Sequence, residues 1–310
     1  MKKIFIDGKA GTTGLRIYDR LIQRKDITLL TLSEEQRKDI HMRRNALNSA
    51  DIAFLCLPDQ AAVEAVSMID NESTVVIDTS TAHRTTDGWA YGFPELSKAH
   101  EERILSAKRI AVPGCHASGF IALVYPLIEA GILTKDALLT CHSLTGYSGG
   151  GKKMIAAYEA SDRDSLLTAP RQYGLTQQHK HLKEMKAVSG LENEPLFCPI
   201  VSDYYSGMEV TVPLFAKQLR SGAKAEDIKE IYKEKYREGL VQYCDRPDRD
   251  GFLSAAALAG KDSMKIAVLG NSDRILLTAV YDNLGKGASG AALECLNLVM
   301  NKEKAFGLEL

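Results

Sequence analysis

The chain lacks every long run of residues that marks a membrane or nucleic-acid-binding protein. Among its 310 residues no apolar segment approaches about 18 positions, the length that a membrane-spanning helix needs. Its net charge is −1, and no long basic or acidic stretch occurs. We therefore expect neither a membrane nor a nucleic acid as a partner.

Cysteine is scattered along the chain rather than clustered. The six cysteines include no CxxC pair, and this pattern predicts neither a disulfide framework nor a zinc site. The first apolar run soon reaches Asp7 and Gly8, which makes it too short for a signal peptide. Both observations favour a cytoplasmic location.

The first third of the chain alternates apolar strands with amphipathic helices. A length of 310 residues suggests about two domains. The alternation predicts that the first domain is a parallel sheet with helices on both faces. The predicted strands are 3–6, 27–32, 51–57, 74–78 and 109–112, and the first predicted helix is 14–23.

After residue 131 the apolar stretches become longer and the helices fewer. This pattern predicts a mixed domain, with a mainly antiparallel sheet and helices on one face. A terminal helix is predicted over 287–300, where apolar residues recur with helical spacing. The other predicted strands are 137–144, 197–201, 208–215, 264–269 and 274–281, with helices at 152–160 and 225–237.

A thiol lies at a predicted strand-to-helix turn. Residues 110–119 read Ile-Ala-Val-Pro-Gly-Cys-His-Ala-Ser-Gly, and an apolar helix is predicted over 120–128. Cys115 is thus expected at the N-terminal end of a helix, where unpaired backbone N–H groups stabilise a thiolate. A thiolate is suited to covalent chemistry on an acyl group. The alternative is that Cys115 is a small buried residue.

A glycine-rich loop connects the first predicted strand to the first predicted helix. It contains Gly8, Gly11, Thr12, Thr13 and Gly14. Glycines let the backbone approach a pyrophosphate, whose charge the helix N-terminus stabilises. The spacing is GxxGxxG rather than GxGxxG, so a plain glycine-rich turn is the alternative.

The end of the second predicted strand bears on the choice of cofactor. A site for NAD usually has an acidic residue there, whereas the 2′-phosphate of NADP needs hydroxyl and cationic donors. Here Ser33 ends the strand and Arg37 follows one turn later. We therefore predict NADP, although Glu34 and Glu35 lie between them and would serve NAD.

Two further segments offer donors for the anionic groups of a substrate. Ser80 and Arg84 follow the predicted strand 74–78 at its carboxyl end, where ligands of open α/β sheets bind. Arg84 is either a bidentate clamp for a phosphoryl or carboxylate group or a surface arginine. Ser148 and Gly149 lie in a second glycine-rich turn, which is either an anion cradle or a flexible loop.

Five motifs occur in an order that resembles a known family. They are residues 8–14, Gly92-Phe-Pro-Glu-Leu96, Val112-Pro-Gly-Cys-His116, Thr145-Gly-Tyr-Ser-Gly-Gly-Gly151 and Gln178-His-Lys-His181. Over nearly the whole chain they resemble the N-acetyl-γ-glutamyl-phosphate reductases, in their shorter bacterial form. Where longer relatives read Pro-Gly-Cys-Tyr-Pro-Thr, this chain reads Pro-Gly-Cys-His-Ala-Ser. His116 therefore receives no role from the resemblance.

The resemblance implies an α/β fold with two domains. One is a Rossmann-type dinucleotide-binding domain, expected over 1–118 and 285–310, and the other is an α+β catalytic and oligomerisation domain over 119–284. The second domain would be of the semialdehyde-dehydrogenase and glyceraldehyde-phosphate-dehydrogenase type. The implied reaction is the NADPH-dependent reduction of the acyl phosphate N-acetyl-γ-glutamyl phosphate to its semialdehyde, through a thioester on Cys115, in arginine biosynthesis.

A proton donor or base is expected near the thiol, and imidazole suits that role. The candidates are His179 and His181, whose i, i+2 spacing points their rings in different directions. The resemblance favours His181 as the acid/base and His179 as a substrate contact, with the reverse assignment left open. The alternative is that both lie on the solvated start of a helix. A metal site is not predicted, because no third ligand accompanies them at a recognisable spacing.

The resemblance also assigns Asn283, Lys286 and Gly287, which precede the terminal helix, to the nicotinamide end of the cofactor. Three rivals are weighed against it. Aspartate-semialdehyde dehydrogenase shares fold and thioester chemistry, but the 178–181 element argues against it. A carrier-protein-linked relative from lysine biosynthesis stays open, whereas the histidine and anion-binding elements argue against a non-catalytic NADP or redox sensor. A homodimer or homotetramer is expected.

Overall fold

The structure is a computed structural model, and it describes residues 1–220 and 222–310. These residues form two units, each built around one β-sheet. The first unit comprises Met1–Pro94, Lys98–Pro113 and Ala291–Gly307. The second comprises Glu95–Ser97, Gly114–Gly290 and Leu308–Leu310.

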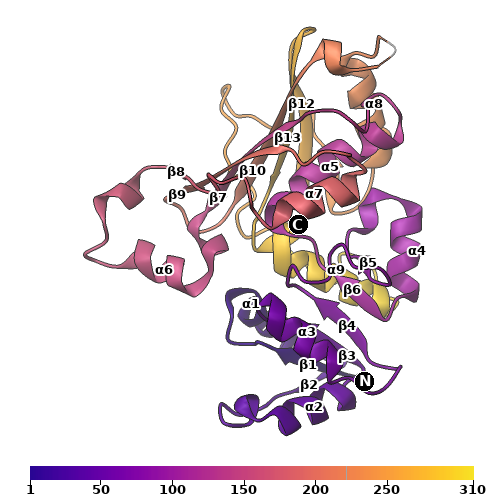
Figure 1. The fold of residues 1–310 in the computed structure, drawn as a ribbon, viewed down its shortest axis with the longest axis vertical. Helices are drawn as coiled ribbons and strands as arrows, with labels where there is room; N and C mark the ends of the chain where they lie inside the picture. Colours follow the sequence, from indigo (N-terminus) through magenta and orange to yellow (C-terminus); the bar gives the residue numbers. More distant parts are fainter. Residues whose placement is uncertain (221) are drawn as a thin grey trace. The chain divides into compact units, whose positions relative to one another are not determined.

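The sheet of the first unit is parallel throughout, with the strand order β2-β1-β3-β4-β6-β5 (Figure 1). Helices connect most of its successive strands, as parallel pairing requires. Its strands are β1 (Lys2–Asp7), β2 (Ile27–Leu30), β3 (Ile52–Leu55), β4 (Val75–Asp78), β5 (Ala90–Tyr91) and β6 (Arg109–Ala111). Its helices are α1 (Thr12–Leu21), α2 (Ile40–Ser49), α3 (Asp59–Ser67), α4 (Lys98–Ser106) and α9 (Gly290–Val299), of which Gly290 belongs to the second unit.

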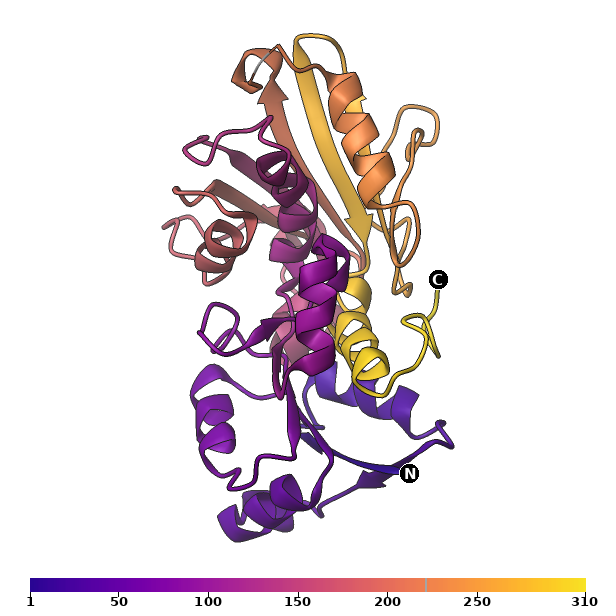
Figure 2. The same cartoon turned by 90° about the vertical axis from the view of Figure 1, so that its right-hand side faces the viewer.

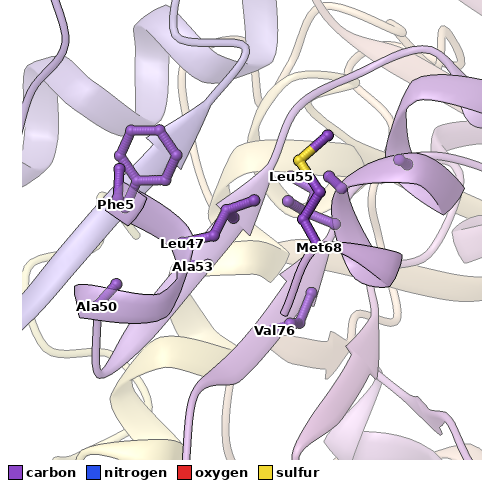
Figure 3. Packing of buried hydrophobic residues seen from close by; sticks show 10 residues of the cluster. Phe5, Leu47, Ala50, Ala53, Leu55, Met68 and Val76 are labelled. Atoms are coloured by element: carbon purple, nitrogen blue, oxygen red, sulfur yellow. The ribbon is translucent and has the colours of Figure 1, made fainter. Parts of the chain in front are cut away.

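One face of this sheet packs against α2 and α3. Phe5 and Leu55 from the strands form a buried cluster with Leu47 of α2 and Ala62 of α3 (Figure 3). Ala53 belongs to the same cluster, two positions before Leu55 on β3, because alternate side chains of a strand point to opposite faces. The packing fixes the strands, so the carboxyl end of β1 holds the glycine loop in a defined place.

The second unit contains a mainly antiparallel sheet, with the strand order β11-β12-β13-β10-β7-β9-β8 (Figure 1). Only the pairs β7–β9 and β11–β12 are parallel among the described strands of this sheet. Its strands are β7 (Thr140–Gly146), β8 (Arg171–Gln172), β9 (Leu196–Ser202), β10 (Met208–Phe215), β11 (Val241–Tyr243), β12 (Met264–Gly270) and β13 (Arg274–Tyr281).

Helices cover one face of that sheet (Figures 1 and 2). Helix α5 packs on β10 and β13 and also contacts α7 and α8, while α8 contacts β12. Gly119 of α5 permits the closest approach, because a Cβ atom there would lie 2.7 Å from Oη of Tyr281. The helices of the second unit are α5 (Cys115–Glu129), α6 (Gly151–Glu159), α7 (His181–Ser189) and α8 (Ala225–Lys235).

The predicted fold class is confirmed, although most predicted elements differ from the observed ones by one to three residues at an end; β2, for example, ends at Leu30 and not at residue 32. Two differences bear on the site. The apolar helix expected over 120–128 begins earlier, because Gly114 serves as its N-cap and Cys115 is its first residue. The terminal helix expected over 287–300 is divided into a π-helical turn, Gly285–Ser289, and α9. Single π-helical turns are frequent at functional sites, and this one lies beside Cys115.

Candidate active site

Cys115 is the first residue of α5 and is half-buried. No side chain caps this helix start, and its first turn contains no acidic residue. A helix start of this kind stabilises negative charge on the sulfur or on a bound oxygen. A Cβ atom on Gly287 would lie 3.0 Å from Cβ of Cys115, so this glycine leaves room beside the thiol.

Two buried side chains fix the turn that presents the thiol. Glu184 of α7 accepts a hydrogen bond from the backbone N–H of Gly114 at 2.8 Å. Tyr281 of β13 donates to the carbonyl of Cys115 and accepts from the N–H of Gly119. These hydrogen bonds connect the start of α5 to α7 and to strand β13. Glu184 lies three residues after His181, so the same helix also positions a histidine.

Three histidines, one of which directly follows Cys115 in the chain, lie close together in the second unit. The ring of His116 lies 5.8 Å from that of His179 and 5.6 Å from that of His181, measured between centroids. His179 and His181 are 4.8 Å apart. Phe197 of β9 packs edge-on against His116 and His179. The structure therefore brings the predicted histidine pair together with the residue that follows Cys115.

The two predicted histidines differ in environment. His181 is the first residue of α7 and is 6% exposed, whereas His179 precedes the helix and is half-buried. Nδ1 of His179 accepts a hydrogen bond from the backbone N–H of His181 at 3.2 Å. Burial, and after it the charge of Lys180, lower the pKa of His179. The ring of His179 is thus held with Nδ1 as an acceptor, which leaves Nε2 to donate.

Ser148 and Gly149 lie in a short 3₁₀ helix, Tyr147–Gly150, directly after β7. Ser148 is buried and its Oγ accepts a hydrogen bond from Asn283 Nδ2 at 3.0 Å. Asn283 also accepts from the backbone N–H of Gly207 at 2.9 Å. Ser148, a predicted substrate residue, and Asn283, a predicted cofactor residue, are therefore hydrogen-bonded to each other in the second unit.

Lys286 lies in the π-helical turn and is almost fully buried. Its ammonium group forms a 2.6 Å ion pair with Glu95, which is also buried. A buried ion pair of this kind is strongly destabilised when one partner is removed, because the other charge is then left uncompensated. This pair fixes the turn that contains Gly287.

The glycine loop of the first unit has the geometry of an anion-binding turn. Gly8 has a φ of +87°, and a Cβ atom there would lie 2.2 Å from the carbonyl oxygen of Cys56. A Cβ atom on Gly14 would lie 2.5 Å from the carbonyl oxygen of Gly8. Gly11 is the N-cap of α1, no side chain caps that helix, and its first turn carries no acidic residue. Among the described residues, the buried hydroxyl of Thr12 has no hydrogen-bond partner. With Thr13, these groups fit the pyrophosphate of a dinucleotide.

A cleft in the first unit connects this loop to the end of β2. Its lining includes Gly8, Lys9, Tyr18, Leu32 and Arg37. Arg37 forms an ion pair with Glu34, and its backbone N–H donates to the carbonyl of Ser33 at 3.0 Å. Ser33 and Arg37 are thus neighbours at the end of the cleft where the adenosine ribose of a dinucleotide binds in such folds.

The other two predicted substrate residues lie in the first unit and are hydrogen-bonded within it. Ser80 donates to Asp78 at 2.7 Å. Arg84 donates to the carbonyl of Val112 at 2.9 Å and to that of Thr79 at 3.1 Å. These contacts hold the segments that follow β4 and β6. Their assignment to the substrate stays a prediction.

Sequence reasoning missed four residues of this site. They are Glu184 and Tyr281, described above, and Ser143 and Tyr173, which both hydrogen-bond to the ring of His116. Glu184 alone had a local signal, because its spacing of three from His181 places both on one helix face. The other three come from separate strands or loops, so only tertiary folding brings them together.

Within residues 1–220 and 222–310, no group of three or more His, Cys, Asp or Glu is arranged to hold a metal. Over the same ranges no helix is long and apolar enough to cross a bilayer.

Comparison with known proteins first defines a class. Residues 3–104 match the NAD-binding domain of the semialdehyde dehydrogenases, and residues 115–283 match their dimerisation domain. A crystal structure of aspartate semialdehyde dehydrogenase II from Vibrio cholerae superposes with a TM-score of 0.73 at 17% identity, covering 97% of this chain and 98% of that one. An aspartate semialdehyde dehydrogenase from Candida albicans, solved with NADP, gives a TM-score of 0.66 at 15% identity, covering 97% of this chain and 98% of that one. The chain therefore has the fold of a semialdehyde dehydrogenase.

More similar sequences narrow the class. The chain is 46% identical to an N-acetyl-γ-glutamyl-phosphate reductase of Chelativorans sp., over 96% of this chain and 98% of the relative. It is 44% identical to N-acetyl-γ-glutamyl-phosphate reductase 2 of Nostoc sp., over 99% of each. The chain belongs to the N-acetyl-γ-glutamyl-phosphate reductase family. It is an oxidoreductase with a nicotinamide dinucleotide cofactor. The resemblance seen in the sequence is confirmed, and the rival activities are not favoured.

Proposed function

We propose that the protein reduces N-acetyl-γ-glutamyl phosphate to N-acetylglutamate semialdehyde with release of phosphate, using NADPH, in the cytoplasm and as a step of arginine biosynthesis. The observation that carries the proposal is the half-buried Cys115 at the start of α5, with His179 and His181 packed around the next residue, His116. The relatives that are 44–46% identical bear the name of this activity. Six free thiols support the cytoplasmic location.

Cys115 is the proposed nucleophile. Its thiolate attacks the acyl carbon, a C–S bond forms, and the C–O bond to phosphate breaks, so that phosphate leaves with the bonding electrons. The resulting thioester accepts hydride more readily than a carboxylate does, which is the gain of covalent catalysis. Reduced nicotinamide, when bound, supplies that hydride.

His181 is the proposed acid/base. A hydride arriving at the thioester carbon leaves negative charge on its oxygen. Proton donation by an imidazolium stabilises that oxygen, and return of the proton accompanies cleavage of the C–S bond. The products of this step are the aldehyde and the free thiolate of Cys115. His179, held with Nε2 as a donor, is the proposed substrate contact.

Ser148 and Gly149 are the proposed binding site for an anionic group of the substrate, with Ser80 and Arg84 as further candidates. The hydrogen bond from Asn283 to Ser148 orients this hydroxyl. We propose that Asn283, Lys286 and Gly287 hold the nicotinamide end of the cofactor and that the glycine loop after β1 holds its pyrophosphate. The dimerisation domain over residues 115–283 supports a homodimer or homotetramer.

The reverse reaction tests the proposal directly. N-acetylglutamate semialdehyde, NADP and phosphate should together give NADPH, measured by absorbance, and omission of phosphate should stop the reaction. Aspartate semialdehyde under the same conditions is the control substrate. If aspartate semialdehyde is oxidised faster, the protein is an aspartate-semialdehyde dehydrogenase and the proposed substrate is wrong.

Cofactor preference is the second expectation that arises here. Since Ser33 and Arg37 stand where an acid would bind the ribose of NAD, we expect a clear preference for NADP. Arg37→Ala should weaken NADP by about tenfold, the equivalent of one charge-assisted contact of roughly 1.4 kcal/mol, and leave NAD nearly unchanged. Arg16→Ala is the control, because Arg16 lies on α1 and Arg37 lies after β2. Equal kcat/KM values for the two cofactors in the parent enzyme would rule out the 2′-phosphate assignment.

A further inference from the structure

Three polar side chains of the second unit form a hydrogen-bonded row that the proposed reaction does not use. Oγ of Ser143 lies 2.7 Å from Nδ1 of His116, and Oη of Tyr173 lies 2.7 Å from Nε2 of the same ring. Ser143 is fully buried and His116 is 3% exposed, whereas Tyr173 is half-buried. The row therefore runs from the core of the unit to its partly exposed edge.

The phenol end of this row lies at the Cys115 site. The ring of Tyr173 meets that of His179 edge-on, with 6.0 Å between centroids. Burial, and after it the charge of Cys115, raise the pKa of Tyr173, so the phenol and the thiol are close enough to interact. The middle of the row, His116, is the residue that follows Cys115.

His116 is neutral. Burial, and after it the charge of His179, lower the pKa of His116 to about 3. A neutral imidazole carries one N–H and one acceptor nitrogen, so it donates to one neighbour and accepts from the other. The hydrogen bonds of the row therefore all run one way. The hydroxyl proton at one end, of either Ser143 or Tyr173, is then left without an acceptor inside the row.

The two directions differ in where the last proton is left. If Tyr173 donates to His116 and His116 to Ser143, the seryl proton is left in the core, because among the described residues Ser143 Oγ has one hydrogen-bond partner. A buried donor without an acceptor costs about 1–3 kcal/mol. If Ser143 donates first, the last proton is on the half-buried phenol, where a ligand or water can accept it. The second direction is favoured.

We propose that Ser143 and His116 are positioning residues for Tyr173. Ser143 donates to Nδ1 of His116, Nε2–H of His116 donates to Oη of Tyr173, and the phenolic proton is left to donate to an oxygen of the acyl substrate. The inference rests on the proposed function, which supplies the substrate. In this role the imidazole of His116 stays neutral and transfers no proton.

Two substitutions of one residue separate this role from simple packing. In His116→Gln the amide nitrogen can occupy the place of Nε2 and still donate to Tyr173, whereas in His116→Asn the shorter amide reaches only Ser143. We expect His116→Asn to raise KM for the semialdehyde by roughly 3- to 10-fold, the equivalent of one neutral hydrogen bond. The kcat should change less, and His116→Gln should stay within about twofold of the parent.

A double-mutant cycle then asks whether His116 acts through the phenol. Tyr173→Phe should raise KM by a similar factor, and adding His116→Asn to it should raise KM no further, because the group that is positioned is already absent. Equal effects of Asn and Gln at position 116 would overturn the proposal. So would an undiminished effect of His116→Asn in the Tyr173→Phe background.

The tautomer of His116 is measurable in the parent protein without any variant. ¹⁵N-histidine NMR should show one ring that does not titrate between about pH 5 and pH 8, with its proton on Nε2. A proton on Nδ1 would reverse the row and refute the proposal, even if every variant failed to fold. A parent enzyme inactive toward N-acetylglutamate semialdehyde would instead refute the proposed function. The NMR spectrum would still give the tautomer of His116 in that case.

Discussion

Replacing Cys115 by serine should abolish reduction of the acyl phosphate and leave NADPH binding intact. A serine alkoxide is scarce at neutral pH, and an oxygen ester accepts hydride poorly compared with a thioester. The glycine loop belongs to the first unit, whereas Cys115 belongs to the second. We therefore expect the cofactor Kd, measured by fluorescence titration, to stay within about twofold of the parent while kcat falls below detection.

Rapid-quench mass spectrometry of the parent should detect an acyl adduct on the peptide that contains Cys115. Cys244→Ser is the matched control, because this thiol is also half-buried in the second unit and follows β11, away from α5. It should keep full activity and the same adduct. Activity of Cys115→Ser within about tenfold of the parent, or about 1.4 kcal/mol of barrier, would exclude Cys115 as the nucleophile.

The parts of the molecule that sequence reasoning predicted correctly are those that depend on near neighbours in the chain. The strands β10 and β13 have the predicted bounds, since their ends coincide with changes in local apolar pattern. The glycine loop could be located because strand, loop and helix occupy only about twenty residues. The position of Cys115 at the N-terminal end of a helix is predicted for an equally local reason, the preceding Pro113 and Gly114, although the helix itself is expected only from residue 120.

The rest depended on partners that are far apart in the sequence. His116 and Tyr173 are separated by 57 positions, and Lys286 and Glu95 by 191. Arg84 shows why such a local pattern is ambiguous. A cation at the end of a strand suggests an anionic ligand, but a backbone carbonyl 28 residues away also accepts its hydrogen bonds. Which acceptor is present is decided by the tertiary fold, so no local pattern reveals it.

Replacing His181 by asparagine should lower kcat by roughly 10²- to 10⁴-fold, the usual range for loss of a general acid/base. It should also remove one limb of the pH–rate profile. Asparagine keeps a polar group at the start of α7 but cannot exchange a proton near neutral pH. The loss of kcat should therefore occur without loss of folding, checked by thermal unfolding of the variant.

His179→Asn is the paired variant, and it should act mainly on KM. Its ring is held with Nδ1 as an acceptor for the N–H of His181, and its lowered pKa favours the neutral form, which suits a hydrogen-bond donor more than a proton shuttle. A fall in kcat for His179→Asn with little change for His181→Asn would exchange the two roles and leave the reaction unchanged. If neither variant reduces kcat/KM, the pair is structural. His116 does not then take over, because its lowered pKa of about 3 keeps the ring neutral and both ring nitrogens are already hydrogen-bonded.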